Sequence, residues 1–485
     1  MEKSNTTKKI AKNFSWLLLG NIVGGTINFI LVVYVARTLG AVVFGLLQFA
    51  LAFIAYLYMV VDSGLSIFGT RGIAKDPSQV GDYSLNIILM RLTLALFVFF
   101  AALLVVWLIP IAFNVRLLFI AVFSLVFYHA LRPDWIFQGL EKMQYIAFAR
   151  ILYPVISFLL IVFLVKQAGD LVRVPLIQSA CGLIVATLFL IILFKKYVHV
   201  KLTDVNVSSW PKYFIQAFPL GASAFLTIIY GNMDMIMLGF MDQPAVVGYY
   251  NAAYRIFYIL GGIFGLWVAT AIPTMSKRIG EDKDGSKMFL DKFTHITLLG
   301  IIPITVLIYL ASPLVIGFVF GPEYTSAVFG LQVLIWAIIP IAIGSIYGQL
   351  ILISAGFFKR FFQAVVLGVG ANIILNFILI PRFSFIGAAI ATILAELIVT
   401  IMVMKYSQKV LPIKIGHHFI KPLIIVLAAL IGFYVVYFPT AFMSEYPRIF
   451  IACGFAFLLC LLSVQLIDGK FLSGFIKELI VKRER

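Results

Sequence analysis

The chain alternates long apolar runs with short polar breaks along its whole length. A helix needs about 20 mostly apolar residues to cross the hydrocarbon core of a bilayer, and most of these runs reach that length. Charged residues, prolines and glycines mark the breaks between them. The pattern therefore predicts roughly fourteen membrane-spanning helices. Their expected ranges are 14–36, 43–66, 85–109, 114–137, 144–165, 174–194, 213–240, 246–273, 294–320, 327–354, 361–380, 385–404, 418–438 and 447–467.

The placement of lysine and arginine supports this number of spans. Cytoplasmic loops of membrane proteins carry an excess of both residues, and a wrong number of spans would scramble that asymmetry. With the N-terminus in the cytoplasm, roughly thirty of the 37 Lys and Arg residues fall on that side. The opposite loops then hold only Arg37, Arg116, Lys166, Arg173, Arg382 and Arg448. We predict a multi-pass protein of the cytoplasmic (inner) membrane with both termini in the cytoplasm.

Weak internal similarity divides the spans into two halves. FQGLEK at 137–142, after the fourth span, is similar to ISAGFFKR at 353–360, after the tenth. Halves with an even number of spans enter the membrane from the same side, so they would be parallel repeats. We expect six-helix bundles at 1–200 and 201–410, followed by an additional helix pair and a basic tail at 411–485.

The amino-acid composition indicates a membrane protein. With 63% hydrophobic and 12% charged residues, the sequence has too few polar side chains to cover a soluble core. We therefore expect an all-α polytopic membrane protein. The formal charge of +17 is explained by basic cytoplasmic loops rather than by nucleic-acid binding. Cys181, Cys453 and Cys460 lie inside apolar runs, where they act as small hydrophobic residues.

Arg255 lies near the middle of the eighth predicted span. An uncompensated arginine at the bilayer centre costs roughly 3 to over 10 kcal/mol, so such a residue normally faces a watery cavity or a partner and marks function. Asn251, Tyr254 and Tyr258 share its helix face, because they stand three, four or seven positions apart. We predict that this face lines a cavity.

Other polar residues recur at helical spacing inside predicted spans. They are Asn21 and Asn28 in the first span, Gln48 in the second, and Ser223, Thr227, Tyr230 and Asp234 in the seventh. A hydrogen bond between helices, worth about 1 kcal/mol, explains any one of them. As a set they predict a polar cavity lining, with Asp234 as a partner for the charge of Arg255.

The motifs of several other chemistries are absent from the sequence. It contains no Walker loop, no paired-cysteine or HExxH zinc spacing, and no nucleophile elbow. We therefore expect neither an ATP-driven pump nor an enzyme, and no cofactor or metal site. His417 and His418 lie in a basic loop, where a solvated or headgroup-facing surface is a better explanation than a ligand pair. His129 in the fourth span is better explained by packing than by proton transfer.

Several stretches resemble one known family and together cover essentially the whole chain in order. They are ARTLGAVVFGLLQFALAF (36–53), DSGLSIFGTRGIAK (62–75), FQGLEKM (137–143), DMIMLGFMDQPAVVGYYNAAYRI (234–256), FGPEY (320–324) and ILIPRFSFIGAAIATILAE (378–396). These stretches resemble Wzx-type polysaccharide-unit flippases, such as those for O-antigen. That family belongs to the MOP superfamily, together with MATE drug exporters and the peptidoglycan lipid flippase.

The resemblance implies two six-helix bundles around a cationic central cavity. Undecaprenyl-pyrophosphate-linked oligosaccharide would cross from the inner to the outer leaflet there by alternating access. The positions that match the family's cavity are Arg255, Asn21, Asn28 and Gln48, with Arg37 and Arg71 as mouth residues and Arg150 as a further candidate. The implied partners are lipid-linked oligosaccharide, membrane lipids, a polysaccharide polymerase and a chain-length regulator. Coupling to a proton or sodium gradient stays open.

Two other functions compete with this one. A MATE-like, cation-coupled exporter of small molecules would be expected to carry mainly carboxylates inside its spans, whereas Asp234 and Glu396 are few and the cavity candidate is cationic. A membrane glycan polymerase would be expected to carry a sizeable outer loop with catalytic groups, and no predicted outer loop is that large. The sequence therefore favours transport of an anionic cargo.

Overall fold

The computed structural model describes residues 2–198, 205–413 and 415–481, and within these ranges it is built of helices without a strand. The described side chains exclude those of residues 2–8, 10, 11, 222–224, 226, 227 and 470–481. Two predicted lining residues, Ser223 and Thr227, therefore lie outside the described side chains. Packing divides the chain into two compact units, unit 1 (Met1–Gly248) and unit 2 (Tyr249–Arg485).

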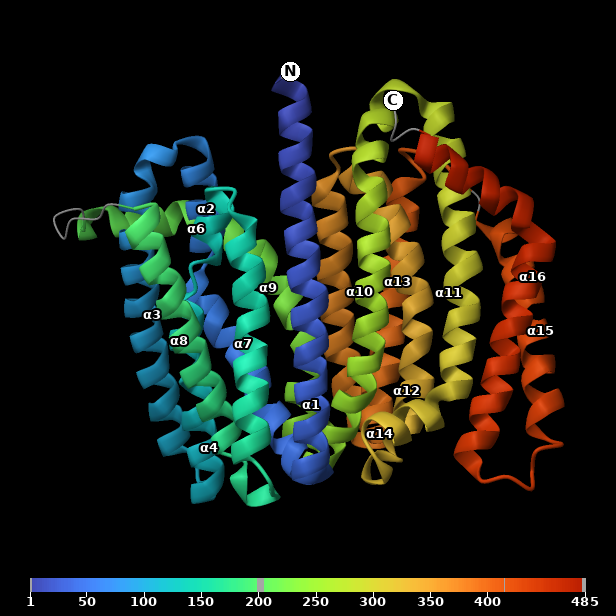
Figure 1. Ribbon diagram of the computed structural model, residues 1–485, viewed down its shortest axis with the longest axis horizontal. Coiled ribbons are helices and arrows are strands. Elements are labelled where there is room, and N and C mark those ends of the chain that lie inside the picture. Colours follow the sequence, from blue (N-terminus) through green and yellow to red (C-terminus); the bar gives the residue numbers. More distant parts are fainter. Residues whose placement is uncertain (1, 199–204, 414, 482–485) are drawn as a thin grey trace. The chain divides into compact units, whose positions relative to one another are not determined.

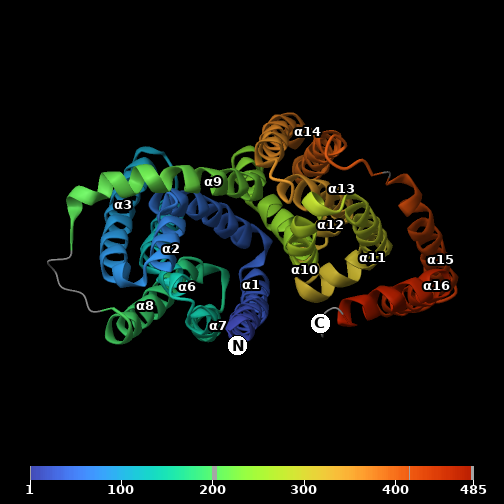
Figure 2. The same ribbon diagram turned by 90° about the horizontal axis from the view of Figure 1, so that it is seen from above.

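Unit 1 holds helices α1 to α9, coloured from blue to green in Figure 1. They are α1 (Glu2–Asp62), α2 (Leu65–Lys75), α3 (Val80–Leu108), α4 (Phe113–Phe123), α5 (Leu125–Leu131), α6 (Asp134–Gly139), α7 (Met143–Leu164), α8 (Arg173–Lys196) and α9 (Trp210–Met241), with 3-10 turns η1 (Pro77–Gln79), η2 (Ala168–Asp170) and η4 (Val207–Ser209). Figure 2 shows α9 running along one side of the unit, where it contacts α1, α2 and α3.

Unit 2 begins within α10 (Figure 1). Its elements are α10 (Pro244–Glu281), α11 (Lys283–Val319), η5 (Pro322–Tyr324), α12 (Ala327–Leu334), η6 (Ile335–Ala337), α13 (Ile338–Ser345), the π-helical η7 (Ile346–Ile353), α14 (Phe358–Ser407), η8 (Gly416–Phe419), α15 (Ile420–Tyr437) and α16 (Glu445–Val481). Helices α12 and α13 pack on α14, while α15 and α16 pack on each other and on α11. The last two helices thus form a pair docked on α11.

The helices agree with the predicted membrane spans. Among the described residues, 11 helices are long and apolar enough to cross a membrane. Two of them, α1 and α14, each join two predicted spans at a sharp break, at Gly40 (φ 75°) and Ser384 (φ 55°). Helix α9 supplies the seventh predicted span, and among its described residues Ile228–Met241 form a shorter apolar stretch. The all-α polytopic membrane fold is confirmed.

The boundary between the units follows packing. It lies after Gly248 because α9 packs against α1 and α2 and so belongs with the helices that precede it. The predicted repeats at 1–200 and 201–410, with the additional pair at 411–485, describe the order of spans rather than their packing. That division stays a prediction.

Small residues let α1 and α7 approach closely. A Cβ added at Gly24 would lie 2.3 Å from the Arg150 carbonyl oxygen, and one at Gly20 would lie 2.7 Å from the Ala147 Cα. Helices in lipid gain little from hydrophobic burial against each other, so close backbone contact supplies much of their attraction. The glycine spacing in the first span therefore serves packing.

Candidate functional site

A tight turn joins α1 to α2 in unit 1. Ser63 (φ 41°) and Gly64 (φ 84°) both adopt positive φ, and the Ser63 hydroxyl donates to the Val60 carbonyl (2.7 Å). A Cβ at Gly64 would lie 2.2 Å from the Ala217 carbonyl oxygen of α9. Only glycine fits both this backbone conformation and this contact. The turn fixes the direction in which Asp62, the last residue of α1, faces its neighbours.

A second break separates α5 from α6 at Pro133. The residue before a proline is driven towards extended backbone, and Arg132 accordingly has φ −56° and ψ 121° and ends α5. Proline has no N–H, so the His129 carbonyl lacks the donor that would normally come from the residue four positions later. The sequence thus leaves an unpaired carbonyl at the C-terminal end of a helix.

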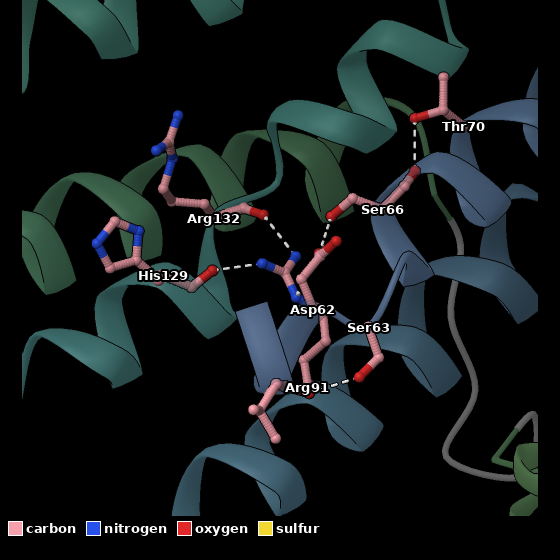
Figure 3. Close-up of polar contacts among 8 residues, drawn as sticks. Asp62, Ser63, Ser66, Thr70, Arg91, His129 and Arg132 are labelled. Atoms are coloured by element: carbon pink, nitrogen blue, oxygen red, sulfur yellow. Dashed lines mark hydrogen bonds and ion pairs between the residues drawn. The ribbon is translucent and has the colours of Figure 1, made fainter. Parts of the chain in front are cut away.

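Arg91 of α3 supplies hydrogen-bond donors to the carbonyls at this break. Its guanidinium donates to the His129 carbonyl and to the Arg132 carbonyl (Nη1···O 3.4 Å), and Figure 3 shows both bonds. Its Nε lies 3.6 Å from an Asp62 carboxylate oxygen. The cation also meets the negative end of the α5 dipole. With only 1% of Arg91 exposed, this side chain ties α1, α3 and α5 together.

Polar side chains continue from Asp62 along α2. The Ser66 hydroxyl donates to the Asp62 carboxylate, and the Thr70 hydroxyl donates to the Ser66 carbonyl (2.8 Å), as Figure 3 shows. The Thr70 hydroxyl also lies 3.0 Å from the Trp135 carbonyl oxygen of α6, to which it donates. The α1–α2 turn is therefore bonded to the α5–α6 break from two directions. This mutual support fixes the walls of the space between them.

That space is a pocket of about 400 Å³. Its size falls within the range of about 300–1,000 Å³ that is typical of ligand sites. It is lined by Tyr58, Ser66, Ile67, Thr70, Arg71, Arg91, Arg132, Asp134, Trp135 and Gln138. Arginines from α2, α3 and the α5–α6 break converge here, against one carboxylate in the lining. The pocket is cationic, with hydroxyl and aromatic groups around the charges.

The three arginines differ in their freedom. Arg91 is buried and held by its carbonyl and Asp62 contacts. Arg132 is half-buried and pairs with Asp134. Arg71 is exposed, and within the described part of the chain it forms no ion pair. Arg71 therefore has donors available to a ligand, Arg132 can exchange Asp134 for one, and Arg91 is structural.

Two predicted candidates meet beside this pocket. Arg150 of α7 donates a hydrogen bond to the Asn21 side chain of α1. Arg150 also borders a small space of about 20 Å³ together with Arg132 and Asp134. The structure therefore brings Asn21 and Arg150 together and places Arg150 behind the pocket wall.

The predicted stripe around Arg255 lies in unit 2. Helix α10 is continuous from Pro244 to Glu281, so Asn251, Tyr254 and Tyr258 do share the face of Arg255. Tyr254 stacks on Tyr250 (centroids 5.9 Å apart) and on Tyr258 (6.1 Å apart). Arg255 is half-buried beside this aromatic ladder, while Tyr258 is exposed. The Arg255 guanidinium and the exposed Tyr258 ring thus lie next to each other on this face of α10.

The remaining predicted candidates are spread over unit 1. Gln48 and Asp234 are buried, Asn28 is half-buried, and Arg37 is exposed. None of these four lines the pocket described above. A pair between Asp234 and Arg255 would join the two units, so it stays a prediction.

Sequence reasoning missed Arg91 and Arg132. Both lie inside predicted spans, 85–109 and 114–137, where the rule applied to Arg255 also marks them. Of their partners, Asp134 lies in the same span as Arg132, and Asp62 lies near the end of the second span, 43–66. The signal was present as four charged residues near one side of spans two to four. His129, predicted as a packing residue, packs its ring at a tilt of 38° against Tyr58 (centroids 4.7 Å apart).

Two solved transporters share this fold. The structure is similar to an inward-closed lipid II flippase, MurJ (TM-score 0.75, 17% identity, 94% of this chain and 99% of that chain covered). It is also similar to an inward-facing multidrug resistance MATE family transporter of the MOP superfamily (TM-score 0.63, 14% identity, 81% and 97% covered). The fold is that of MOP-superfamily transporters.

The sequence comparison shows which family the chain belongs to. Residues 10–278 match the polysaccharide biosynthesis protein family, and the chain belongs to that family. A relative from Escherichia coli (strain K12), provisionally named an O-antigen transporter, is 24% identical over 380 residues and covers 77% of this chain and 91% of its own length. The resemblance noted in the sequence is confirmed.

Proposed function

We propose that this chain is a flippase that moves lipid-linked oligosaccharide repeat units across the cytoplasmic membrane, by alternating access, for surface polysaccharide synthesis. Two of the similar proteins are named as an O-antigen transporter and a lipid II flippase. Membership of the polysaccharide biosynthesis family supports extending this kind of transport to the present chain. Undecaprenyl pyrophosphate is the carrier we propose for the glycan.

The observation that carries the proposal is the arginine-lined pocket of unit 1. Arg71, Arg91 and Arg132 come from three different helical segments, yet they line one space of about 400 Å³. In the predicted topology this pocket lies at the cytoplasmic ends of spans two, three and four. Lipid-linked cargo made in the cytoplasm would enter from that side.

Arginine suits a pyrophosphate ligand. The guanidinium stays protonated and presents a planar set of donors that can bind phosphate oxygens in pairs. Arg71 supplies such donors directly, and Arg132 supplies them when the ligand displaces Asp134. Because the displaced carboxylate stays next to Arg132, it can take the arginine back. This exchange between the ligand and Asp134 would help Arg132 to release the cargo after binding it.

The aromatic side chains suit a glycan. Trp135 and Tyr58 line the pocket. Indole and phenol rings pack against the apolar faces of sugars. In unit 2, Arg255 with Tyr254 and Tyr258 repeats the combination of a cation and aromatic rings.

A complementation assay tests the proposal. Variants would be expressed in a strain that lacks its own flippase, with membrane levels matched by immunoblot and surface glycan measured. We expect wild type to exceed R255K and R255K to exceed R255A, and we expect R71Q and R132Q each to lose about 10-fold, as for the loss of a hydrogen bond to a charged group. R382Q is the matched control, because Arg382 is exposed and lies outside the pocket.

Two outcomes would remove the proposed roles. If R71Q and R132Q support as much surface glycan as R382Q, the pocket does not bind the cargo. If the D234N/R255A double variant recovers full surface glycan, Arg255 only neutralises Asp234. A strain in which wild type restores no glycan while exporting a cationic drug would favour the MATE-like exporter instead.

Cellular context completes the proposal. We propose an inner-membrane location with both termini in the cytoplasm, and a polysaccharide polymerase and a chain-length regulator as partners. Transport rather than catalysis is supported by the family relation. Coupling to a proton or sodium gradient remains a prediction.

A further inference from the structure

A cluster of histidine and aspartate side chains lies in unit 2, away from the residues assigned to cargo. Asp291 comes from α11, and His417 and His418 come from η8, the short turn that leads into α15. The sequence predicted a solvated or headgroup-facing surface for both histidines. That prediction is wrong for His418, which is only 3% exposed, whereas His417 is exposed.

We propose that Asp291, His417 and His418 form a binding site for a divalent transition metal such as Zn²⁺. One ligand atom from each residue lies within 4.8 Å of the others. The Asp291 Oδ1 atom is 3.4 Å from His417 Nε2 and 3.0 Å from His418 Nε2. Three donors of the right kind therefore already converge on one point.

The spacing matches metal coordination. Zinc lies about 2.0–2.2 Å from imidazole nitrogen and carboxylate oxygen, so ligand atoms at the corners of a tetrahedron stand about 3.3 Å apart. Both measured separations fall close to this value. A simple hydrogen bond explains one imidazole on Asp291. Two imidazoles directed at the same carboxylate oxygen are better explained by a shared cation.

The donor set selects the class of metal. Two imidazoles and one carboxylate favour zinc and its neighbours among the transition metals, while Mg²⁺ and Ca²⁺ prefer sites made only of oxygen. Three protein ligands leave a fourth position open to water. Because Asp291 and His417 are about half exposed, an ion can enter from solvent.

Neighbouring side chains support the buried ligand. The His295 ring packs 5.6 Å from the His418 ring (centroid to centroid), and His295 is bonded to Asp468 of α16. Lys421, at the start of α15, donates to the same Asp468 carboxylate (2.6 Å). The Asp468 charge is thus already matched by Lys421. Asp291 is left as the carboxylate that faces the two adjacent histidines.

A metal at this point would fasten two elements together. Asp291 belongs to α11, and the histidines immediately precede α15, which with α16 forms the C-terminal pair. The ion would therefore fix the docking of this pair on α11. In the predicted topology the site faces the cytoplasm.

Metal titration of the full-length protein tests the site. The protein would be purified in detergent without a histidine tag, stripped with a chelator, and titrated with Zn²⁺ in the presence of excess Mg²⁺. We expect one Zn²⁺ per chain, affinity at least 10-fold weaker in D291N, and loss of the site in H417Q/H418Q. D284N is the matched control, because Asp284 lies on α11 two turns earlier with its side chain 98% exposed; its affinity should equal that of wild type.

Hydrogen exchange provides a second measurement. Zn²⁺ should slow amide exchange in residues 405–425 of wild type and D284N, but not of D291N. Co²⁺ in place of Zn²⁺ should give the visible absorption of a tetrahedral complex. The proposal is overturned if wild type shows no saturable Zn²⁺ binding, or if D291N binds as tightly as D284N with the same exchange protection. None of these results depends on flippase activity, so the proposed function is tested separately.

Discussion

Replacing Arg91 with leucine is expected to destabilise unit 1. The substitution removes the donor that satisfies the His129 and Arg132 carbonyls at the Pro133 break. It also leaves Asp62 without its cation. Leucine fills much of the volume but donates nothing, so the lost free energy is mainly polar.

The magnitude follows from the burial of the pair. Removing one partner of a buried ion pair costs about 3–5 kcal/mol. The side chain of Arg91 is 1% exposed, but that of Asp62 is 16% exposed and also accepts a bond from Ser66, which softens its loss. Each carbonyl loses a bond from a charged donor, worth about 1.5–3 kcal/mol, and these losses overlap. We therefore expect R91L to lower the free energy of unfolding by about 3–5 kcal/mol.

Unfolding in mixed micelles measures this difference. Purified wild type and variants would be titrated with a denaturing detergent and followed by tryptophan fluorescence. R91K keeps a point charge that reaches one carbonyl at a time, so its loss should be about half that of R91L. R71Q is the matched control: the Arg71 side chain is exposed, and its change should stay within about 0.5 kcal/mol.

A stability of R91L within about 1 kcal/mol of wild type would refute this reasoning. It would mean that water satisfies the two carbonyls and that the buried arginine contributes no net stability. R71Q losing as much stability as R91L would be equally damaging, since the distinction between a structural and a ligand-binding arginine would then fail.

Three further predictions concern other parts of the chain. G64A should lower the stability by more than about 1 kcal/mol in the same unfolding assay, whereas G25A, with open space around its Cβ, should not. Tags in the 277–287 loop should report the cytoplasm and tags near Glu323 the outside; reversal at either site would contradict the topology. The Lys166 N–H donates to the Asp170 carboxylate (2.9 Å) and lowers the pKa of that carboxyl below its ordinary value of 3.8. D170N should therefore be less stable than wild type above about pH 4, and this difference should vanish as the pH falls through the lowered pKa of Asp170.

The spans were predictable because a bilayer imposes length and apolarity on each helix separately. The packing between helices was not predictable in this way. The α1 and α14 breaks fell where Arg37 to Gly40 and Pro381 to Ser384 interrupt the apolar pattern, but the pattern does not show that the backbone stays helical up to the break. The assignment of α9 to unit 1 depends on contacts such as Gly64 on Ala217, which no local signal reveals.

The candidate site was predictable only in part. Arg71 and Arg150 were named through the resemblance to a known family, and Asn21 also by its helical spacing; the structure places Arg71 in the pocket and bonds Arg150 to Asn21. Arg91 carries the same signal as Arg255, a charge inside a predicted span, but its contact was not predictable. That contact depends on Pro133, whose missing N–H leaves the His129 carbonyl to a residue 38 positions earlier in the chain. Such long-range pairing becomes visible only in the folded chain.

The break at Gly40 has a consequence for how the protein enters the membrane. In Figure 1, α1 descends from the N-terminus and α2 lies near the starting end, so the two halves of α1 run in opposite directions and meet at one glycine. With no loop between them, we expect both halves to enter the bilayer together as one hairpin. A reporter inserted at the turn should therefore disturb this hairpin as well as report on which side the turn lies.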